Sequence, residues 1–229
     1  MIPLIVIRPQ PGCDATVAEA NTLGLEAYGV PLFAVVPVAW HAPAADSFDA
    51  LLLGSANALR HGGSQLSAYI GKPSYVVGAA TAKAADAAGL VVVAIGHGGL
   101  QPVLDTIGPE HRRLLRLAGQ ERISLVPPGN VSMIERIVYT STALPIPHAL
   151  VARLREPAVV MLHSAEAARH FTAECDRHAI DRARLALAAI GPRVAAAAGE
   201  GWRALCTAPK ADGASVLALA RQMCQDRHR

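Results

Sequence analysis

Short runs of apolar residues alternate with alanine-rich stretches along the chain. Runs such as 4–7, 51–53 and 159–162 are continuous and contain no regularly spaced polar positions. Continuous runs of Val, Ile and Leu are typical of strands buried on both faces, as in parallel sheets. The stretches between them, such as 79–88 and 165–174, favour helices. This alternation predicts an α/β fold of parallel sheets with helical crossovers. Further predicted strands are 76–77, 90–95 and 187–190, and a further predicted helix is 194–198.

An internal repeat divides the chain into two related halves. The segment Leu53–His61 recurs as Leu162–His170, with six of nine positions identical. Each copy ends a predicted strand and begins a helix, with a serine at the expected N-cap position. A second pair, Val76–Ala82 and Ala189–Ala195, again leads from a strand through a glycine into a helix. Chance similarity in alanine-rich sequence is the alternative, but the shared order and near-equal spacing disfavour it.

The two ends of the chain are predicted to share one domain. The N-terminal strand 4–7 and the helix 16–28 have no sheet of their own, whereas the second half of the repeat can accept them as neighbours. We therefore predict a discontinuous domain of residues 1–36 and 145–229, with a second domain, residues 41–136, inserted into it.

The two crossings between these domains, 37–40 and 137–144, are β-prone and border on prolines. They predict a two-stranded linker between two flavodoxin-like domains, with a cleft between the domains. Within the inserted domain we also expect helices near 100–107 and 111–117 and a strand at 123–126.

Composition excludes several classes of protein. The 229 residues are 52% hydrophobic with a net charge of +3, too apolar for disorder and without the basic block of a nucleic-acid-binding protein. No apolar run approaches the ~18 residues that cross a bilayer, and the N-terminus lacks the features of a signal peptide. The four cysteines show no CxxC spacing and the histidines no metal-ligand spacing, so we expect no metal. A soluble, cytoplasmic protein is predicted.

Several segments, taken in order, resemble the uroporphyrinogen-III synthase family over nearly the whole chain. These segments are Val6–Pro9, Gly24–Tyr28, Pro31–Val36, Leu53–Ala58, Val77–Ala82, Val138-Tyr139 and Ala189–Pro192. The chain departs from the family where a helix normally precedes Val138, because only the short segment 127–133 intervenes. Gly54 and His163 also stand before the two repeat serines, where threonine is more usual.

The resemblance implies a cyclising lyase of tetrapyrrole and haem biosynthesis. Such an enzyme converts linear hydroxymethylbilane into uroporphyrinogen III with loss of water and inversion of ring D. Loss of the terminal hydroxyl leaves an azafulvene, which ring D attacks through its substituted carbon to form a spiro intermediate. Without enzyme the bilane closes to the uninverted isomer, so catalysis is mainly a matter of positioning. The resemblance implies no cofactor, a monomer, and at most a transient contact with the upstream deaminase.

The substrate is rich in carboxylates, whereas the chain is only mildly basic, so helix N-termini are candidate partners. Candidate substrate-binding residues at strand ends and helix starts are Arg8, Ser55, Ala56, Gly78, Thr81, Gly98, Ser164, Ala165 and Gly191. The alternative is that each serine only caps a helix, each glycine only forms a turn, and Arg8 only makes a structural ion pair.

Tyr139 is the candidate catalytic residue. It matches the family tyrosine proposed to help the hydroxyl leave, and its phenol can donate a proton or a hydrogen bond. An ordinary interfacial tyrosine is the alternative. His61, His163 and His170 are predicted to be polar surface or hinge residues and not metal ligands.

Two other functions compete with the synthase. A non-catalytic two-domain module that binds a small polyanion would have the same architecture without a required Tyr139. A nucleotide-dependent enzyme is disfavoured because GxGxxG and P-loop patterns are absent from the sequence.

Overall fold

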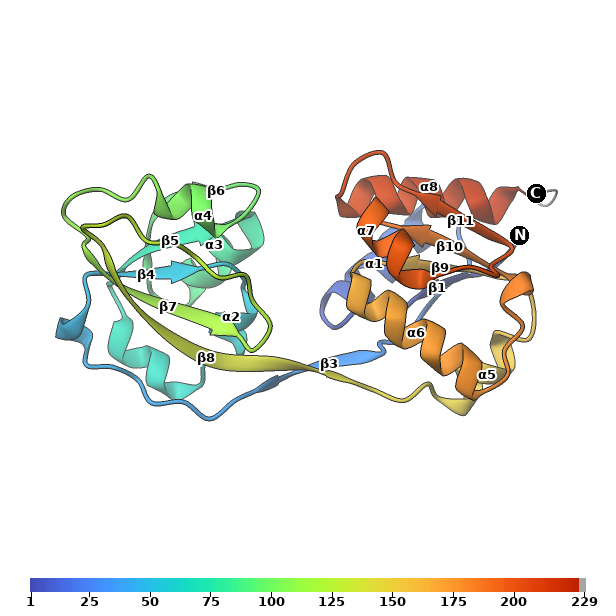
Figure 1. Ribbon diagram of the computed structural model, residues 1–229, viewed down its shortest axis with the longest axis horizontal. Helices are drawn as coiled ribbons and strands as arrows, with labels where there is room; N and C mark the ends of the chain where they lie inside the picture. Colours follow the sequence, from blue (N-terminus) through green and yellow to red (C-terminus); the bar gives the residue numbers. More distant parts are fainter. Residues whose placement is uncertain (227–229) are drawn as a thin grey trace. The chain divides into compact units, whose positions relative to one another are not determined.

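Two parallel sheets organise the chain, and the structure, a computed structural model, describes residues 1–226. Unit 1 contains Met1–Ala34 and the chain from Thr142 onward, and unit 2 is Val35–Ser141 (Figure 1). The two ends of the chain share unit 1 because β1 pairs in parallel with β9, through Leu4 with Val159 and Val6 with Met161. No helix among the described residues is long and apolar enough to cross a membrane.

Unit 1 is a parallel sheet with helices on both faces. Its elements are β1 (Leu4–Val6), α1 (Gly12–Thr22), β2 (Ala27–Gly29), α5 (His148–Arg153), β9 (Ala158–Leu162), α6 (Ala165–Arg177), η3 (Arg182–Arg184), β10 (Leu185–Ala189), α7 (Pro192–Ala198), β11 (Ala204–Thr207) and α8 (Gly213–Gln225). The strand order is β11-β10-β9-β1-β2 with parallel pairing throughout. This is the order of flavodoxin-like sheets.

The continuous apolar runs of unit 1 reflect burial on both faces of its sheet. In β1, Ile5 belongs to the apolar cluster that contains Phe171 of α6. The neighbouring Leu4 and Val6 belong to the opposite cluster, which contains Val216 of α8. Because successive side chains of a strand point to opposite faces, a strand between two helical layers must be apolar at every position.

Unit 2 contains the second sheet. Its elements are η1 (Ala45–Ser47), β4 (Ala50–Leu53), α2 (Asn57–His61), η2 (Ser64–Tyr69), β5 (Pro73–Val77), α3 (Ala79–Ala87), β6 (Val91–Gly96), α4 (Leu100–Leu104), β7 (Arg113–Gly119) and β8 (Ser132–Ala143), with β3 (Phe33–Pro37) at its edge. The order is β3-β8-β7-β4-β5-β6, and β8, β7, β4, β5 and β6 run parallel. The predicted α/β class is therefore confirmed.

The internal repeat corresponds to equivalent parts of the two sheets. Strands β4, β5 and β6 lie side by side in that order, as do β9, β10 and β11. On the other side of these trios, β7 and β8 occupy the places that β1 and β2 occupy in unit 1. The two units thus have the same spatial order of strands, but the first strand along the chain occupies a different place in each unit. The two crossings of the chain lie on β3 and β8, which are neighbours in the sheet.

Two predicted elements of unit 2 are wrong. Residues 111–117, predicted as a helix, form most of β7, and 123–126, predicted as a strand, is an extended loop. An apolar run as short as Leu114–Leu117 does not distinguish a helix from a buried strand. Pro127 and Pro128 follow this segment and cannot donate ladder hydrogen bonds, which disfavours a strand there. Ile123 and Val126 are exposed.

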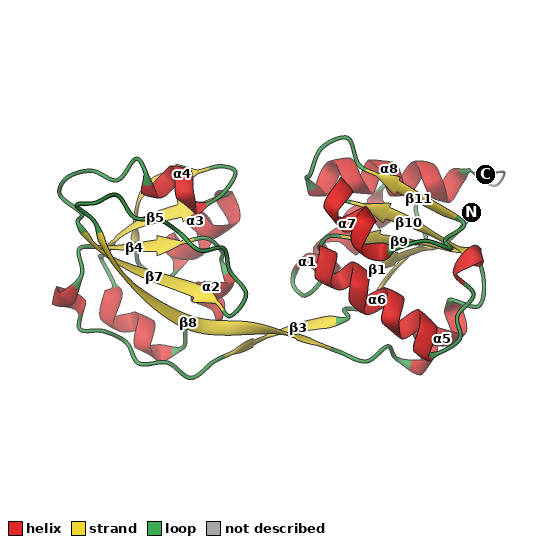
Figure 2. Cartoon of the chain, in the orientation of Figure 1, coloured by secondary structure: helices red, strands yellow, loops and turns green. Residues whose placement is uncertain are grey.

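The crossover from β7 to β8 contains no helix, and Figure 2 shows it as a loop throughout. The equivalent crossover of unit 1 contains α1, which buries Cys13, Thr16 and Ala20. In unit 2 the loop contributes only Leu125 and Val131 to the cluster on that face of the sheet. This face is therefore more thinly covered than its counterpart.

Each unit has its own apolar core. We therefore predict that a cavity-creating substitution in one core destabilises that unit and not the other. Leu52→Ala is expected to destabilise unit 2 by about 2–5 kcal/mol, because Leu52 is fully buried within it. Leu187→Ala in unit 1 is the matched control. Hydrogen exchange should show loss of protection in β4, β5 and β7 for the first variant and in β9 and β10 for the second. Loss of protection in both units from one substitution would contradict the prediction.

Candidate active site

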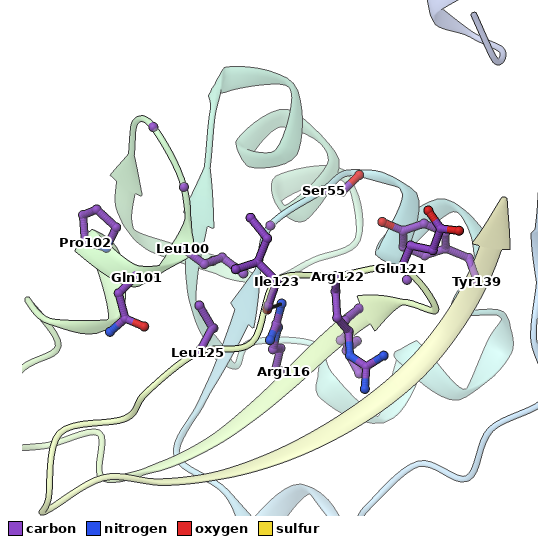
Figure 3. Close-up of a pocket in the computed structure, with 16 residues that line it drawn as sticks. Ser55, Leu100, Gln101, Pro102, Arg116, Glu121, Arg122, Ile123, Leu125 and Tyr139 are labelled. Atoms are coloured by element: carbon purple, nitrogen blue, oxygen red, sulfur yellow. Dashed lines mark hydrogen bonds between the residues drawn. The ribbon is translucent and has the colours of Figure 1, made fainter. Parts of the chain in front are cut away.

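A cavity of about 280 Å³ lies at the carboxyl ends of β4 and β7 in unit 2 (Figure 3). Its walls come from the residues after β4, the start of α4, the end of β7, the loop after β7 and one side chain of β8. Ligands of open α/β sheets usually bind at this edge, because the loops that follow parallel strands meet there. Three predicted site residues, Ser55, Gly98 and Tyr139, line this one cavity.

Tyr139 is held in the cavity by the backbone of the neighbouring strand. It pairs with Gly119 across an irregularity in the β7–β8 register, and its backbone carbonyl accepts a hydrogen bond from Gln120 at 2.9 Å. Its ring lies against Gly119, where a Cβ atom would come within 2.6 Å of the Tyr139 Cε2 atom. The ring centroid of His61 is 6.3 Å away. Glycine at position 119 therefore allows the phenol to lie flat on the strand.

Ser55 and Gly98 line other parts of the cavity. Ser55 was expected at the N-cap of a helix, but Ala56 holds that position and Ser55 accepts from the Asn57 N–H at 3.2 Å instead. Gly98 has φ +80°, a conformation that L side chains rarely adopt, and it leads into α4. Both residues place backbone groups at the cavity wall.

Two arginines of this region were missed by the sequence analysis. Arg116 of β7 is only 4% exposed, and its Nη1 pairs with Glu135 at 2.8 Å. Arg122 pairs with the same carboxylate through its Nε at 2.5 Å and donates to the Gln120 carbonyl at 2.8 Å. Burial lowers the pKa of Arg116, and Glu135 opposes that shift. The missed signal was one charged residue inside the apolar run Leu114–Gly119, because full burial of arginine is rare unless it is paired.

The other predicted residues of unit 2 lie outside this cavity. Gly78 is the N-cap of α3 and has φ +79°. Ala56 is buried, and Thr81 is only 4% exposed, with its neighbours Ala82 and Ala85 in the core. The burial of Thr81 counts against contact between its hydroxyl and a substrate.

In unit 1 the predicted residues lie at the carboxyl edge of that sheet. Ser164 is the N-cap of α6 and accepts from the Ala167 N–H at 3.1 Å, as the sequence predicted, so Ala165 is the first helical residue. Gly191 is the N-cap of α7, with Pro192 in the first turn. Arg8 follows β1 and turns toward α1, where its Nη1 donates to Thr16 Oγ1 at 3.4 Å.

His163, predicted to be a polar surface or hinge residue, is half-buried, and both of its ring nitrogens are buried. Neither ring nitrogen has a hydrogen-bond partner within the described residues. Burial, assisted by the charge of Arg8, lowers the pKa of His163 to about 4. His170 is part-buried, with Nε2 at 2.8 Å from the Leu144 carbonyl. No cluster of metal-ligating side chains occurs among residues 1–226.

The chain is a parallel α/β protein whose sheet edge holds a cavity lined by basic and phenolic groups, which suit an anionic ligand. The profile of the family described as "Uroporphyrinogen-III synthase HemD" matches residues 14–218. The chain belongs to this family, whose members are cyclising lyases of haem biosynthesis.

A solved structure shows the same fold over nearly the whole chain. Uroporphyrinogen-III synthetase from Helicobacter pylori has a TM-score of 0.66 at 14% identity, covering 97% of this chain and 100% of the other. The synthase from Thermus thermophilus has a TM-score of 0.44 at 18% identity, covering 100% of both chains. No curated protein shows a sequence match to the chain.

Because Tyr139 lies against Gly119, one methyl group added at position 119 is predicted to lower both stability and activity. Gly119→Ala places a Cβ 2.6 Å from the ring, so the phenol must move. We expect a loss of about 1–3 kcal/mol in the free energy of unfolding and reduced turnover. Gly129→Ala is the control, because a Cβ there meets open space. Urea unfolding and activity assays compare the two variants, and equal behaviour would show that the ring does not depend on Gly119.

The buried imidazole predicts acid sensitivity. Between pH 6.5 and about 4 the unfolded chain binds a proton at His163 that the folded chain does not. The contribution of the neutral imidazole to the free energy of unfolding is therefore fully present above pH 6.5. It falls as the pH approaches 4, by at most about 1.4 kcal/mol per pH unit. His163→Asn should flatten this slope, whereas His148→Asn, at an exposed histidine, should not. Urea unfolding from pH 4 to 7 measures the slopes, and the same slope in the wild type and His163→Asn would refute the prediction.

Proposed function

We propose that the cavity of unit 2 binds hydroxymethylbilane during its conversion to uroporphyrinogen III, and that Tyr139 is the catalytic residue. The observation that carries the proposal is the position of Tyr139. Its phenol is fixed on Gly119 in a cavity that also contains Arg116 and Arg122. A hydrogen-bond donor next to positive charge fits a substrate that carries carboxylates and loses a hydroxyl.

Tyr139 assists the departure of that hydroxyl in this proposal. Its O–H donates a hydrogen bond or a proton to the leaving oxygen, so that water departs and the terminal carbon becomes electrophilic. A donor aligned before the reaction stabilises developing charge without reorganisation. The ring contact with Gly119 provides this alignment.

Positioning supplies the remainder of catalysis. The uncatalysed bilane closes to the isomer with ring D uninverted, so the protein must favour attack through the substituted carbon. Substrate carboxylates held at fixed points restrict the conformations of the bilane and favour that geometry. We propose that the carboxyl edge of unit 1, with Arg8 and the helix starts at Ser164 and Gly191, supplies further contacts of this kind.

Further properties of the protein are proposed from the sequence and the family resemblance. They are that the protein acts as a cytoplasmic monomer without a cofactor, that its contact with the upstream deaminase is transient, and that its domains are 1–36 with 145–229 and 41–136.

The function is tested by the isomer that forms. Hydroxymethylbilane, freshly generated by the deaminase, is incubated with and without the protein, and the porphyrinogens are oxidised and separated by chromatography. A yield of isomer III proportional to the protein supports the proposal. Isomer I alone from a folded sample would leave a non-catalytic binding protein.

Tyr139→Phe removes the donor and leaves the ring in place. We expect turnover to fall by about 10- to 100-fold without being abolished, as for the loss of one hydrogen bond to developing charge. Tyr28→Phe in unit 1 is the control. Residue 28 is distant in sequence from the residues that line this cavity and is not one of them. Initial rates of isomer III formation give the comparison. Unchanged turnover in Tyr139→Phe would exclude a catalytic role for the hydroxyl.

A further inference from the structure

The buried guanidinium of Arg116 has one unused donor. Its Nη1 pairs with Glu135 at 2.8 Å, and its Nη2 donates to the Ile123 carbonyl at 2.9 Å. Its Nε is buried and has no partner within the described part of the chain. Since an unpaired buried donor is unfavourable, such a group calls for an explanation.

The unused donor lies on the edge of the guanidinium that best recognises a carboxylate. Nε and Nη2 point in the same direction and can bind a carboxylate with two parallel hydrogen bonds. Arg113, on the same strand, uses this edge against Asp49 at 3.0 and 2.7 Å. The same edge of Arg116 has only one backbone carbonyl, which accepts from Nη2 and leaves Nε free.

That carbonyl belongs to the loop that replaces the missing helix. Ile123 is 81% exposed and Val126 is 75% exposed, so neither anchors the loop by apolar burial. Polar contacts hold this part of the loop. The side chain of Gln101 bonds to both the N–H and the carbonyl of Val126, and Arg116 donates to the carbonyl of Ile123. Water can replace these polar bonds when the loop moves, so its displacement costs mainly the packing of Leu125 against the apolar cluster on that face of the sheet.

The charges around the cavity favour an anion at this point. Arg116 and Arg122 share the single carboxylate of Glu135, which leaves one positive charge in excess in this cluster. Glu121 also lines the cavity, but it is exposed and lies beside Tyr139 in Figure 3. Arg116 is buried and is drawn below Ile123 in the same view.

We propose that Arg116 binds one carboxylate of the substrate through its Nε and Nη2, and that this carboxylate displaces the carbonyl of Ile123. The loop carbonyl thus occupies the place of a substrate group in the empty protein. This inference rests on the proposed function and adds a binding residue to it.

Arg116→Gln tests the proposal by steady-state kinetics with hydroxymethylbilane. We expect KM to rise about 10- to 100-fold, as for the loss of a charge-assisted pair, with kcat little changed. Arg116→Lys should recover only part of the affinity, because an ammonium cannot form the two parallel bonds. Arg113→Gln is the matched control on the same strand. Its loss breaks the exposed pair with Asp49, and KM should stay at the wild-type value.

Removal of Arg116 also leaves Glu135 unpaired, so a structural effect must be separated from a binding effect. Arg116→Gln combined with Glu135→Gln removes both charges together. If KM rises as much in the double variant as in the single one, the loss belongs to the carboxylate contact. Wild-type KM in a folded double variant overturns the proposal.

A measurement on the wild-type protein decides the question if the variants do not fold. Uroporphyrin III, which presents the substrate's carboxylates on a closed ring, is added, and hydrogen exchange is followed at residues 123–126. Displacement of the loop should accelerate exchange at the Val126 amide, which bonds to Gln101. Unchanged exchange at saturating uroporphyrin III overturns the proposal.

Failure of the function and failure of the binding site remain distinguishable. If the wild-type protein yields only isomer I, the proposed function is wrong. Uroporphyrin III that binds the wild type at least tenfold more tightly than Arg116→Gln would still support the carboxylate site. Equal binding to both proteins would refute it.

Discussion

A chain that builds a parallel sheet must cross back over one face of the sheet after each strand, and the cover of each face depends on these crossovers. In unit 1 the crossover from β1 to β2 contains α1, and the face below it is packed. The equivalent crossover in unit 2, from β7 to β8, is a loop. The cavity, the buried arginine and the access to Tyr139 all depend on this one difference.

The polar partners available under that loop explain how a buried charged residue occurs in the middle of a sheet. A buried guanidinium is costly unless it is paired, and the backbone carbonyls inside a helix are already used in the helix's own hydrogen bonds. The loop instead offers the carbonyl of Ile123, and β8 offers the carboxylate of Glu135. The incomplete pairing that remains connects structure to function, because a partly satisfied donor in a cavity favours the binding of an anion.

Much of the architecture could be predicted from the sequence, because the interactions responsible are local or periodic. The continuous apolar runs predicted strands buried on both faces, and the repeat predicted two related halves. Ser164 at the N-cap of α6 was predicted from its position alone. The helix predicted over 16–28 ends at Thr22, and Ala27–Gly29 form β2. Two further errors lie between β6 and β8, where short apolar runs and prolines leave strand and helix equally compatible with the pattern. One of these errors hid Arg116, because residues 111–117 were assigned to a helix.

The sequence by itself determined the α/β class, the internal repeat and the resemblance to the family, in which Tyr139 matches a family tyrosine. The tertiary structure decided which of the candidate residues meet. It placed Ser55, Gly98 and Tyr139 around one cavity, buried Thr81 and the ring nitrogens of His163, and put Arg116 beneath the loop. The physical reason is that burial and partner geometry depend on strand order and register, which bring together residues far apart in the chain. Local periodicity indicates which face a side chain occupies, but not what lies opposite it.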